Sequence, residues 1–332
     1  LPAAERETLE RLSVFETALD DEELAYARVT PAALRRWGGL SLVQRQQGAA
    51  PEVPAYLQHL LATLPEAERR KFEGKTTYNL HPLVRDYLLG NLPHETRTTH
   101  HSWAAEFYGQ PFVEIARRMV RPGAKVTQEQ LESFARDRDG VIGQMVARTD
   151  DMQEARAAMA RALLWQAQLF QAGQHQASAE IVMAVWLVLA RWGERDRAKA
   201  LLAGSIRTLE GLNKAVAQAN LASLLQEEGK LAEALSIHEE LYAIFESLDA
   251  RQQMGASLAQ QSSVLMDMGR LDEAIAKQEA SLEIDRQRGD EQGQAISLHQ
   301  LSILHEMKDD YPRALARSQA AEALNLAGKQ PP

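Results

Sequence analysis

Hydrophobic, small and polar positions recur at one fixed interval in the C-terminal part of the chain. Three segments align without gaps at one constant spacing: ANLASLLQEEGKLAEAL from Ala219, AQQSSVLMDMGRLDEAI from Ala259 and HQLSILHEMKDDYPRAL from His299. Alanine, leucine, glutamine and glutamate favour helices, and a turn residue interrupts each segment. The pattern therefore predicts three successive helical hairpins.

Small residues occupy the same two positions in every repeat. The first set is Ala222, Ser262 and Ser302, and the second set, later in each segment, is Ala234, Ala274 and Ala314. Helices can pack closely where small side chains let their backbones approach, so these positions are expected to be helix crossings. Gly229 and Gly269 mark the turns because glycine readily adopts a left-handed conformation, and Asp309 takes that place in the third repeat.

Each hairpin leaves an apolar face that only a neighbouring hairpin can cover, so the repeats are expected to stack. The pattern resembles the tetratricopeptide repeat (TPR) family, whose usual repeat is about 34 residues, and the longer interval implies slightly longer helices. The resemblance covers residues 213–328, and a less regular hairpin around Ala198 is expected before them. The prediction is a TPR-type α-solenoid of about four helical hairpins over residues 151–332; an unrelated bundle of hairpins is the alternative.

The repeat pattern is absent from residues 1–110, where the sequence predicts different elements. Helices are expected in LERLSVF, DDEELAYAR and TPAALRRWGGL, strands in SLVQRQ and KTTYNL, and a further helix in HPLVRDYLLGNL. Pro31 and Pro82 stand in first-turn positions, where proline is favourable. This order describes a small winged-helix domain over residues 1–92, with an insertion at about 49–73, and residues 93–150 are expected to be a helical linker. The fold class is mainly α.

The same region resembles the C-terminal part of the signal-transduction ATPases with numerous domains (STAND), which are NB-ARC-like. Four segments carry the resemblance: LERLSVF, LRRWGGLSLVQR, YNLHPLVRDYLLGNL and HETRTTHHSWAAEFY. In bacterial members a nucleotide-binding domain precedes a winged helix, and TPR repeats often follow. The resemblance implies that His81 lies near the β-phosphate of bound ADP and helps to hold the resting state. Pro82 follows it, where plant relatives commonly carry aspartate.

Charge and apolar runs limit the classes of partner. The net charge is −9, with 19 basic and 21 acidic residues in 1–150 and 18 basic and 25 acidic residues in 151–332. Neither part has the basic surface that phosphate binding normally requires, so nucleic acid is not an expected partner. The longest apolar run, from Ile181 to Ala190, is about half of the ~20 residues that a membrane helix needs, and it predicts a buried helix instead.

Catalytic and cofactor motifs are absent from the sequence. The chain has no cysteine, which excludes thiolate chemistry and fits a cytoplasmic location. EGKTTY suggests a phosphate-binding loop, but Arg69 stands where that loop needs a second glycine before Gly74. No hydrolase motif is present. We therefore expect a protein that is not an enzyme and holds no cofactor, with ADP or ATP bound only through a nucleotide-binding domain outside this chain.

Two groups of polar residues could be taken for other sites. One candidate metal site is His94, His100 and His101 with Glu95 and Glu106. None of its pairs has the i, i+4 spacing of a helical zinc motif, so no metal is expected and the histidines are predicted to be solvated or capping. Arg35 and Arg36 lie on the third helix, where a winged helix would contact DNA, but the near-neutral charge favours packing against another domain.

The repeats offer the best candidate binding surface. One helical position reads Asn220, Gln260 and Gln300, and a carboxamide both donates to and accepts from a peptide backbone. Further polar residues are expected on the same face: Ser223, Gln226, Glu227, Ser263, Asp267 and His299. Together they predict a protein- or peptide-binding groove. The alternative is that they are merely polar residues on an exposed side of a helix.

These patterns favour the regulatory and sensor region of a STAND signalling ATPase. The repeats would bind a protein or peptide, and the winged helix would relay that event to a nucleotide-binding domain. The chain starts LPAAERETLE, without an initiator methionine, and is expected to be a fragment of a longer protein. A stand-alone TPR adaptor and a DNA-binding regulator with a TPR arm are the alternatives.

Overall fold

The computed structural model describes residues 1–332 except 16–17, 48–75, 122–123, 149 and 328–332. The described chain is mainly helical and forms two compact units, Leu1–Val185 and Trp186–Pro332, which divide within helix α11 (His175–Arg191). The predicted insertion at about 49–73 lies outside the described residues. The predicted domain boundaries near residues 92 and 150 stay predictions.

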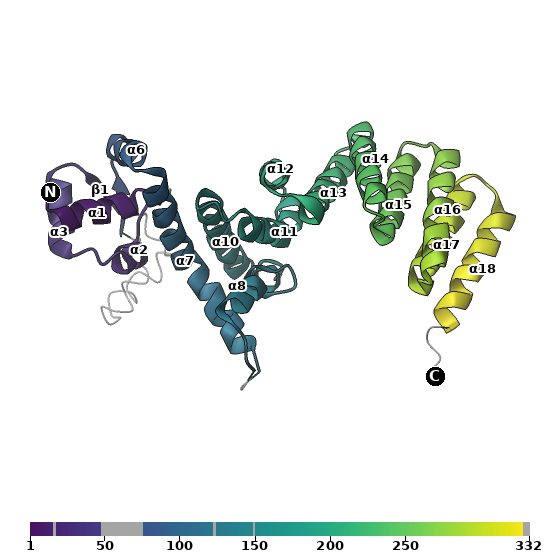
Figure 1. Cartoon of the computed structure of the whole chain (residues 1–332), viewed down its shortest axis with the longest axis horizontal. Coiled ribbons are helices and arrows are strands. Elements are labelled where there is room, and N and C mark those ends of the chain that lie inside the picture. The colour runs from purple at the N-terminus through teal and green to yellow at the C-terminus, as the bar shows by residue number, and fades with distance from the viewer. Residues whose placement is uncertain (16–17, 48–75, 122–123, 149, 328–332) are drawn as a thin grey trace, which may run out of the picture. The chain divides into compact units, whose positions relative to one another are not determined.

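The N-terminal elements occur in the predicted order (Figure 1). They are α1 (Ala3–Leu12), α2 (Asp21–Tyr26), α3 (Pro31–Gly39), β1 (Val43–Gln47), β2 (Thr76–Leu80) and α6 (Pro82–Asn91). The strands pair antiparallel, with Val43 opposite Leu80. Side-chain caps stabilise the starts of two helices. Asp20 and Glu23 form a capping box on α2, and the Thr30 hydroxyl caps α3.

Four more helices complete the first unit. They are α7 (His94–Met119), α8 (Gln128–Arg136), α9 (Val141–Val146) and α10 (Met152–Gln171). Helix α7 packs against α8 and α10. Gly109 makes the contact with α10 possible, because a Cβ atom there would lie 2.4 Å from Cε2 of Trp165. The Trp165 indole instead stacks on Phe112, with ring centroids 5.9 Å apart.

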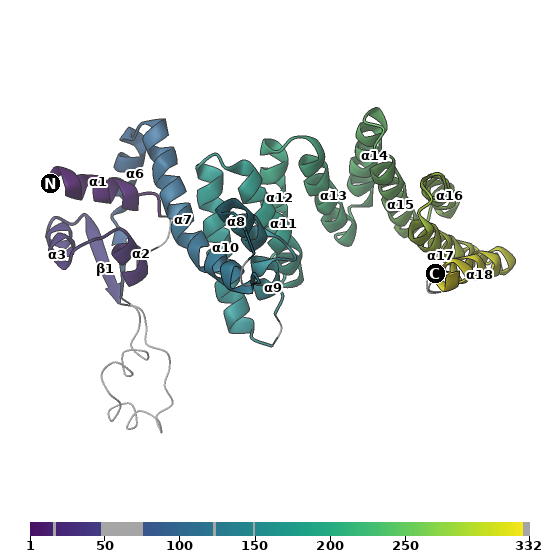
Figure 2. The same cartoon turned by 60° about the horizontal axis from the view of Figure 1, so that its bottom comes forward.

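The second unit is a row of antiparallel helices (Figures 1 and 2). Its helices are α12 (Arg195–Thr208), α13 (Gly211–Glu227), α14 (Leu231–Ser247), α15 (Arg251–Asp267), α16 (Leu271–Arg288), α17 (Glu291–Met307) and α18 (Tyr311–Ala327). From α12 to α18, each helix packs on the next. The hairpins expected from the constant interval are therefore confirmed.

The crossings and turns of the hairpins are also confirmed. Ala222, Ala234 and Ala274 are fully buried, and the Ser262 hydroxyl donates to the Ala274 carbonyl oxygen at 2.8 Å. The three turn residues are left-handed: Gly229 has φ 76°, Gly269 has φ 72° and Asp309 has φ 58°. Asp309 thus takes the conformation of a glycine, which aspartate tolerates better than most side chains.

The long apolar run forms a buried helix, as predicted. Ile181, Val182 and Val185 of α11 are fully buried. Among the residues that the structure describes, no helix combines the length and the apolar character needed to span a membrane.

Candidate functional site

The predicted groove residues lie on α13, α15 and α17, the first helices of successive hairpins. A hydrogen-bonded link joins two of these helices: the Gln226 amide nitrogen Nε2 donates to Ser263 Oγ at 3.1 Å and to Asp267 Oδ2 at 2.6 Å. Gln226, Ser263 and Asp267 therefore form one polar surface across α13 and α15. The carboxylate and hydroxyl oxygens of this surface retain acceptor capacity for a further partner.

Other predicted residues take different positions. The Ser223 hydroxyl donates to the backbone oxygen of Ala219 in its own helix at 3.1 Å. Glu227 lies 3.8 Å from Arg195 of α12, so its charge is directed toward the preceding helix. His299 is exposed on α17, and Asn220 is half-buried on α13.

Gln260, Ser263 and Gln300 line one pocket of about 460 Å³ between α15, α16 and α17. The structure thus brings together two members of the predicted amide row. The prediction missed the rest of this lining, which includes Gln278, Ser281, Asp285, Arg288, Gly293 and Ser297. Of these, Gln278, Ser281, Asp285 and Arg288 come from α16, the second helix of a hairpin, whereas the predicted face contains only first helices.

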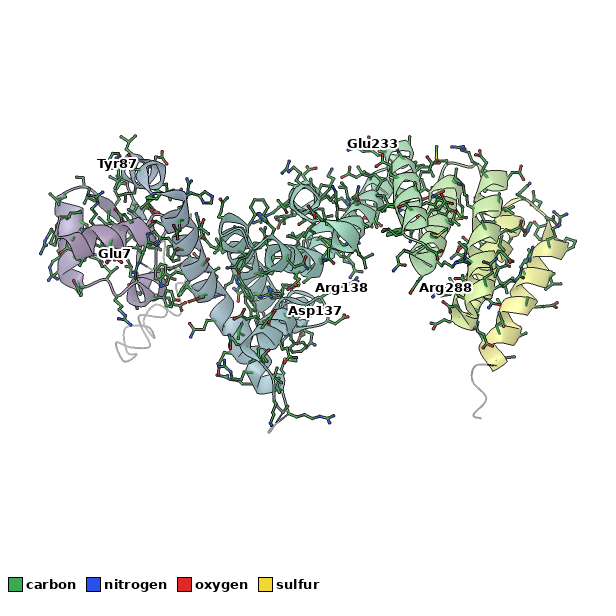
Figure 3. The ribbon with its side chains drawn as sticks, viewed as in Figure 1. Glu7, Tyr87, Asp137, Arg138, Glu233 and Arg288 are labelled. Carbon is green, nitrogen blue, oxygen red and sulfur yellow. The ribbon has the colours of Figure 1, made fainter. Side chains whose placement is uncertain are left out.

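Asp285 is a buried carboxylate within this pocket, with its residue 8% exposed. Ser297 Oγ donates to its Oδ2 at 3.2 Å, and Arg288 Nη1 lies 3.4 Å from its Oδ1. Arg288, labelled in Figure 3, also lies 3.4 Å from Asp290 Oδ2. Burial raises the pKa of the Asp285 carboxyl above its ordinary value, and the hydrogen bond from Ser297 opposes that rise.

Gln278 adds an unsatisfied donor to the same pocket. The residue is 2% exposed, and its amide nitrogen Nε2 has no hydrogen-bond partner among the described residues. A buried amide without a partner carries a desolvation cost of about 1–3 kcal/mol.

His81 lies between β2 and α6, at the N-cap position of α6. Its backbone N–H donates to the Leu42 carbonyl oxygen at 2.9 Å, which ties it to the start of β1. Its side chain makes no capping hydrogen bond to α6. The imidazole therefore stands beside a helix N-terminus without serving as its cap.

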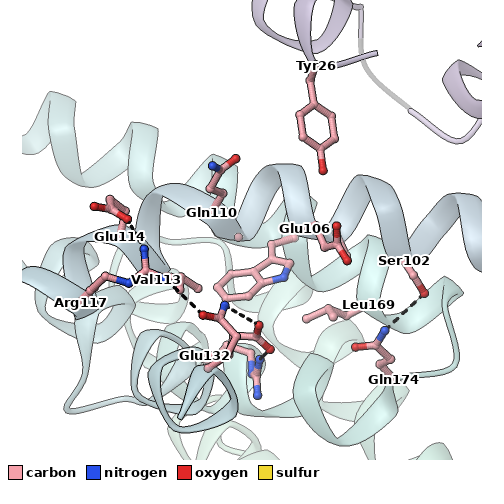
Figure 4. A pocket seen from close by; sticks show the side chains of 15 residues that line it. Tyr26, Ser102, Glu106, Gln110, Val113, Glu114, Arg117, Glu132, Leu169 and Gln174 are labelled. Carbon is pink, nitrogen blue, oxygen red and sulfur yellow. Dashed lines mark hydrogen bonds and ion pairs between the residues drawn. The ribbon is translucent and has the colours of Figure 1, made fainter. Parts of the chain in front are cut away.

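Another pocket, of about 620 Å³, lies in the first unit and was not predicted (Figure 4). Trp165, Leu169 and Val113 form apolar parts of its wall, and three glutamates contribute charge: Glu106, Glu114 and Glu132. Tyr26 points its hydroxyl group toward α7 in Figure 4, and burial and Glu106 together raise the pKa of this phenol. Helices α2, α7, α8 and α10 all contribute, so no local pattern could reveal this pocket.

The cations of the second pocket are already paired. Arg136 Nε donates to Glu180 Oε2 at 2.8 Å, and its guanidinium lies 5.8 Å from the Trp165 ring centroid. Arg117 Nη1 donates to Glu114 Oε2 at 2.7 Å. These pairs serve packing and surface charge balance in the first unit.

The expected solvated role is wrong for two histidines of α7. His100 and His101 are buried, each 7% exposed. His101 faces α10, whereas the charged neighbours of His100 include Arg11, Glu10 and Glu7 of α1. His101 Nδ1 lies 2.8 Å from Gln168 Oε1, and burial lowers the pKa of His100. Within the described part of the chain, no group of histidine and carboxylate residues could hold a metal ion.

The two residues considered for DNA contact differ in their environment. Arg36 Nη1 donates to Glu5 Oε1 at 2.6 Å, whereas Arg35 is exposed. The next residue, Trp37, is 1% exposed, and its indole nitrogen donates to Glu5 Oε2 at 3.1 Å. Glu5 thus fastens α3 to α1 through both Arg36 and Trp37.

Known proteins give a partial match. Residues 253–327 match the family model described as tetratricopeptide repeat. No curated protein matches the chain. Together with the observed hairpins, the family match shows that the chain contains TPR-like helical repeats, which are typical of protein-interaction regions.

Solved structures with similar chains include three with low sequence identity. BtubC (BKLC) from P. vanneervenii is 19% identical, with 73% of this chain and 95% of that chain covered and a TM-score of 0.48. A STAND protein with a tetratricopeptide repeat sensor from Pyrococcus horikoshii is 15% identical, with 98% of this chain covered and a TM-score of 0.43. This chain spans 45% of the length of that STAND protein. The apo form of RapI is 14% identical, with 74% and 67% covered and a TM-score of 0.48.

Proposed function

We propose that this chain is the sensor and regulatory region of a STAND signalling ATPase. Its TPR-like repeats bind a protein or peptide. Residues 1–92 act as a winged helix that relays this event to a nucleotide-binding domain of the same longer protein. The chain works by binding and not by catalysis, and ADP or ATP is held only with that other domain.

The polar surface across α13 and α15 carries the binding part of the proposal. Gln226, Ser263 and Asp267 are joined by hydrogen bonds, and Gln260 and Gln300 continue the row toward α17. Amides and hydroxyls that both donate and accept suit the alternating N–H and C=O groups of an extended peptide. A row on successive first helices gives such a peptide several contacts in one direction.

The surroundings of His81 support the relay part. Helix α6, which His81 precedes, contains no buried residue. Leu83 and Tyr87, one turn apart on α6, are 73% and 65% exposed, and Figure 3 shows Tyr87 at the surface. Exposed apolar side chains that adjoin one another suit a contact with a further domain. A helix N-terminus with an imidazole beside it also suits a phosphate group.

The peptide contact is tested by replacing two amides of the row. Asn220→Ala with Gln260→Ala is expected to weaken binding of the partner by about 1 kcal/mol per lost hydrogen bond. The partner would first be captured with the whole chain, and its affinity for each variant would then be measured by calorimetry. Gln319→Ala, at an exposed position of α18, is the control. Equal affinities for the double variant and the control would place the contact elsewhere.

The relay is tested in the longer protein with His81→Ala. Loss of the imidazole is expected to loosen ADP and raise basal signalling, while the melting temperature of this chain stays nearly unchanged because the side chain makes no cap. His94→Ala, an exposed histidine at the start of α7, is the control. Wild-type ADP affinity and unchanged basal signalling in the His81 variant would show that His81 takes no part in the relay.

A further inference from the structure

Two junctions between neighbouring hairpins differ sharply in chemistry. At the apolar junction, where α13, α14 and α15 meet, Ala215, Leu241 and Phe245 form a buried cluster. Four partly buried residues surround it: Ala219, Ile237, Ala250 and Met254. Each position has a counterpart one repeat interval later, where α15, α16 and α17 meet; we call this place the polar junction.

At the seven equivalent positions of the polar junction, almost every apolar side chain is replaced. The counterparts of the buried cluster are Gly255, Ser281 and Asp285. The counterparts of the surrounding residues are Ala259, Lys277, Asp290 and Gln294. Phe245 and Leu241 fill the first junction, whereas the shorter Asp285 and Ser281 leave space at the second. The pocket of about 460 Å³ lies there.

One glycine makes room for the Asp285 carboxylate. A Cβ atom on Gly293 of α17 would lie 2.8 Å from Asp285 Cγ, whereas one on Gly255 of α15 would lie 3.7 Å from Oδ1, which is an ordinary van der Waals contact. Glycine within a helix costs about 0.5–1 kcal/mol relative to alanine. At Gly293 only glycine lets α17 approach the carboxylate, so the helix composition accommodates this charged group.

The hydrogen-bonding capacity of the polar junction is only partly used. A carboxylate has about four acceptor sites. Ser297 Oγ and Arg288 Nη1 occupy two of them on Asp285, and no other side-chain contact to its oxygens occurs among the described residues. Gln278 Nε2 adds a buried donor without a partner. The pocket therefore offers acceptors at Asp285 and a donor at Gln278.

The charge of the junction favours a cation. Among the charged residues that line the pocket, Asp285 and Asp290 face the guanidinium of Arg288, which leaves an excess of one negative charge in the lining. The whole second unit, residues 186–332, has 16 basic and 22 acidic residues. A negative surface attracts cationic partners, and an added cation would balance the buried carboxylate.

We propose that the pocket of the polar junction receives a lysine or arginine side chain of a bound peptide. The cationic group lies at Asp285, and a backbone carbonyl of the same peptide accepts a hydrogen bond from Gln278 Nε2. The inference rests on the proposed peptide-binding function and adds its specificity, a basic residue at one position.

Peptide pools test this specificity directly. The probes are fluorescein-labelled random nonapeptides whose central residue is fixed as lysine, norleucine or glutamate. Binding to the whole chain is measured by fluorescence polarisation. The lysine pool is expected to bind about fivefold more tightly than the norleucine pool, the scale of one partly desolvated charge pair. In Asp285→Asn, which keeps the side-chain shape, this ratio should fall to about one.

Control variants separate the possible outcomes. Asp196→Asn, whose side chain on α12 is 99% exposed, should keep the preference for lysine. Asp285→Ser repeats the test if Asp285→Asn does not fold, as judged by circular dichroism. Equal binding of the three pools would overturn this inference and leave peptide binding standing. A lysine preference that persists in Asp285→Asn or Asp285→Ser would do the same. If no pool binds, the proposed function fails and this inference fails with it.

Discussion

The apolar junction and the polar junction occupy equivalent places in the repeat scaffold. Both are bounded by crossings with fully buried alanine, Ala234 in one hairpin and Ala274 in the next. Yet Phe245 closes one junction with an aromatic ring, and Asp285 leaves a polar pocket in the other. The comparison shows that a buried alanine is kept at both crossings, whereas the residues of the junction change from apolar to polar. The junction therefore tolerates residues suited to binding.

The largest effect expected from this comparison is a difference in stability between two alanine variants. Phe245→Ala should lower the free energy of unfolding by about 3–5 kcal/mol, because it empties a buried apolar site. Asp285→Ala should change it by less than about 1 kcal/mol, because the pocket is already open and the carboxylate is costly to bury. Urea unfolding followed by circular dichroism compares them. Similar midpoints for the two variants would mean that both junctions stabilise the fold alike.

A second test uses the buried His238 of α14, whose counterpart one repeat interval later is Gln278. Burial lowers the pKa of His238 from 6.5 to about 4. The unfolded chain therefore takes up this proton first, so the stability contributed by neutral His238 is present above about pH 6.5 and is lost as the pH falls toward 4. Between pH 7 and pH 4.5, the free energy of unfolding should fall by about 2.5 kcal/mol more in wild type than in His238→Gln.

The difference between these two chains is the quantity to measure, since other groups titrate in the same range. Urea midpoints of both chains at the two pH values supply it. The same loss of stability on acidification in wild type and in His238→Gln would show that the histidine is not held neutral in the folded state.

The crossing itself should be less tolerant than the polar junction beside it. Ala274→Leu is expected to cost about 1–3 kcal/mol, because it forces extra volume between α15 and α16. Ala280→Leu, at an exposed position of the same helix, should stay within about 0.5 kcal/mol of wild type. Thermal melting of the two variants gives the comparison, and an equally mild effect at both positions would contradict the assignment of Ala274 to a crossing.

The repeat region could be predicted because its signal is periodic. The positions of Ala222, Gly229 and Ala234 return at one interval with a small residue or a turn residue, so each repeat indicates the same packing. The pocket of the polar junction could not be predicted in this way. Asp285 and Ser281 are positions at which the repeats differ, so a search for shared residues passes over them. Their place beside Gln260 and Gln300 follows from the packing of α16 between two first helices.

The N-terminal elements were predictable from local signals, and their surroundings were not. Proline at positions 31 and 82 marks helix starts that the structure contains. The burial of His101 depends instead on α10, which begins only at Met152, after α8 and α9. The same holds for the pocket in Figure 4, whose lining comes from four separate helices. Contacts between distant segments leave no pattern in either segment alone.

The stacked indole of Trp165 has a practical consequence for spectroscopy. The five tryptophans stand at positions 37, 103, 165, 186 and 192, and none follows in the sequence. Emission excited selectively from indole therefore originates in the part of the chain that ends at Trp192, whereas far-ultraviolet circular dichroism is dominated by helices throughout the chain. Recording both signals in one titration therefore compares the packing around the five tryptophans with the melting of helices α13 to α18, which contain no tryptophan, without any label attached to the protein.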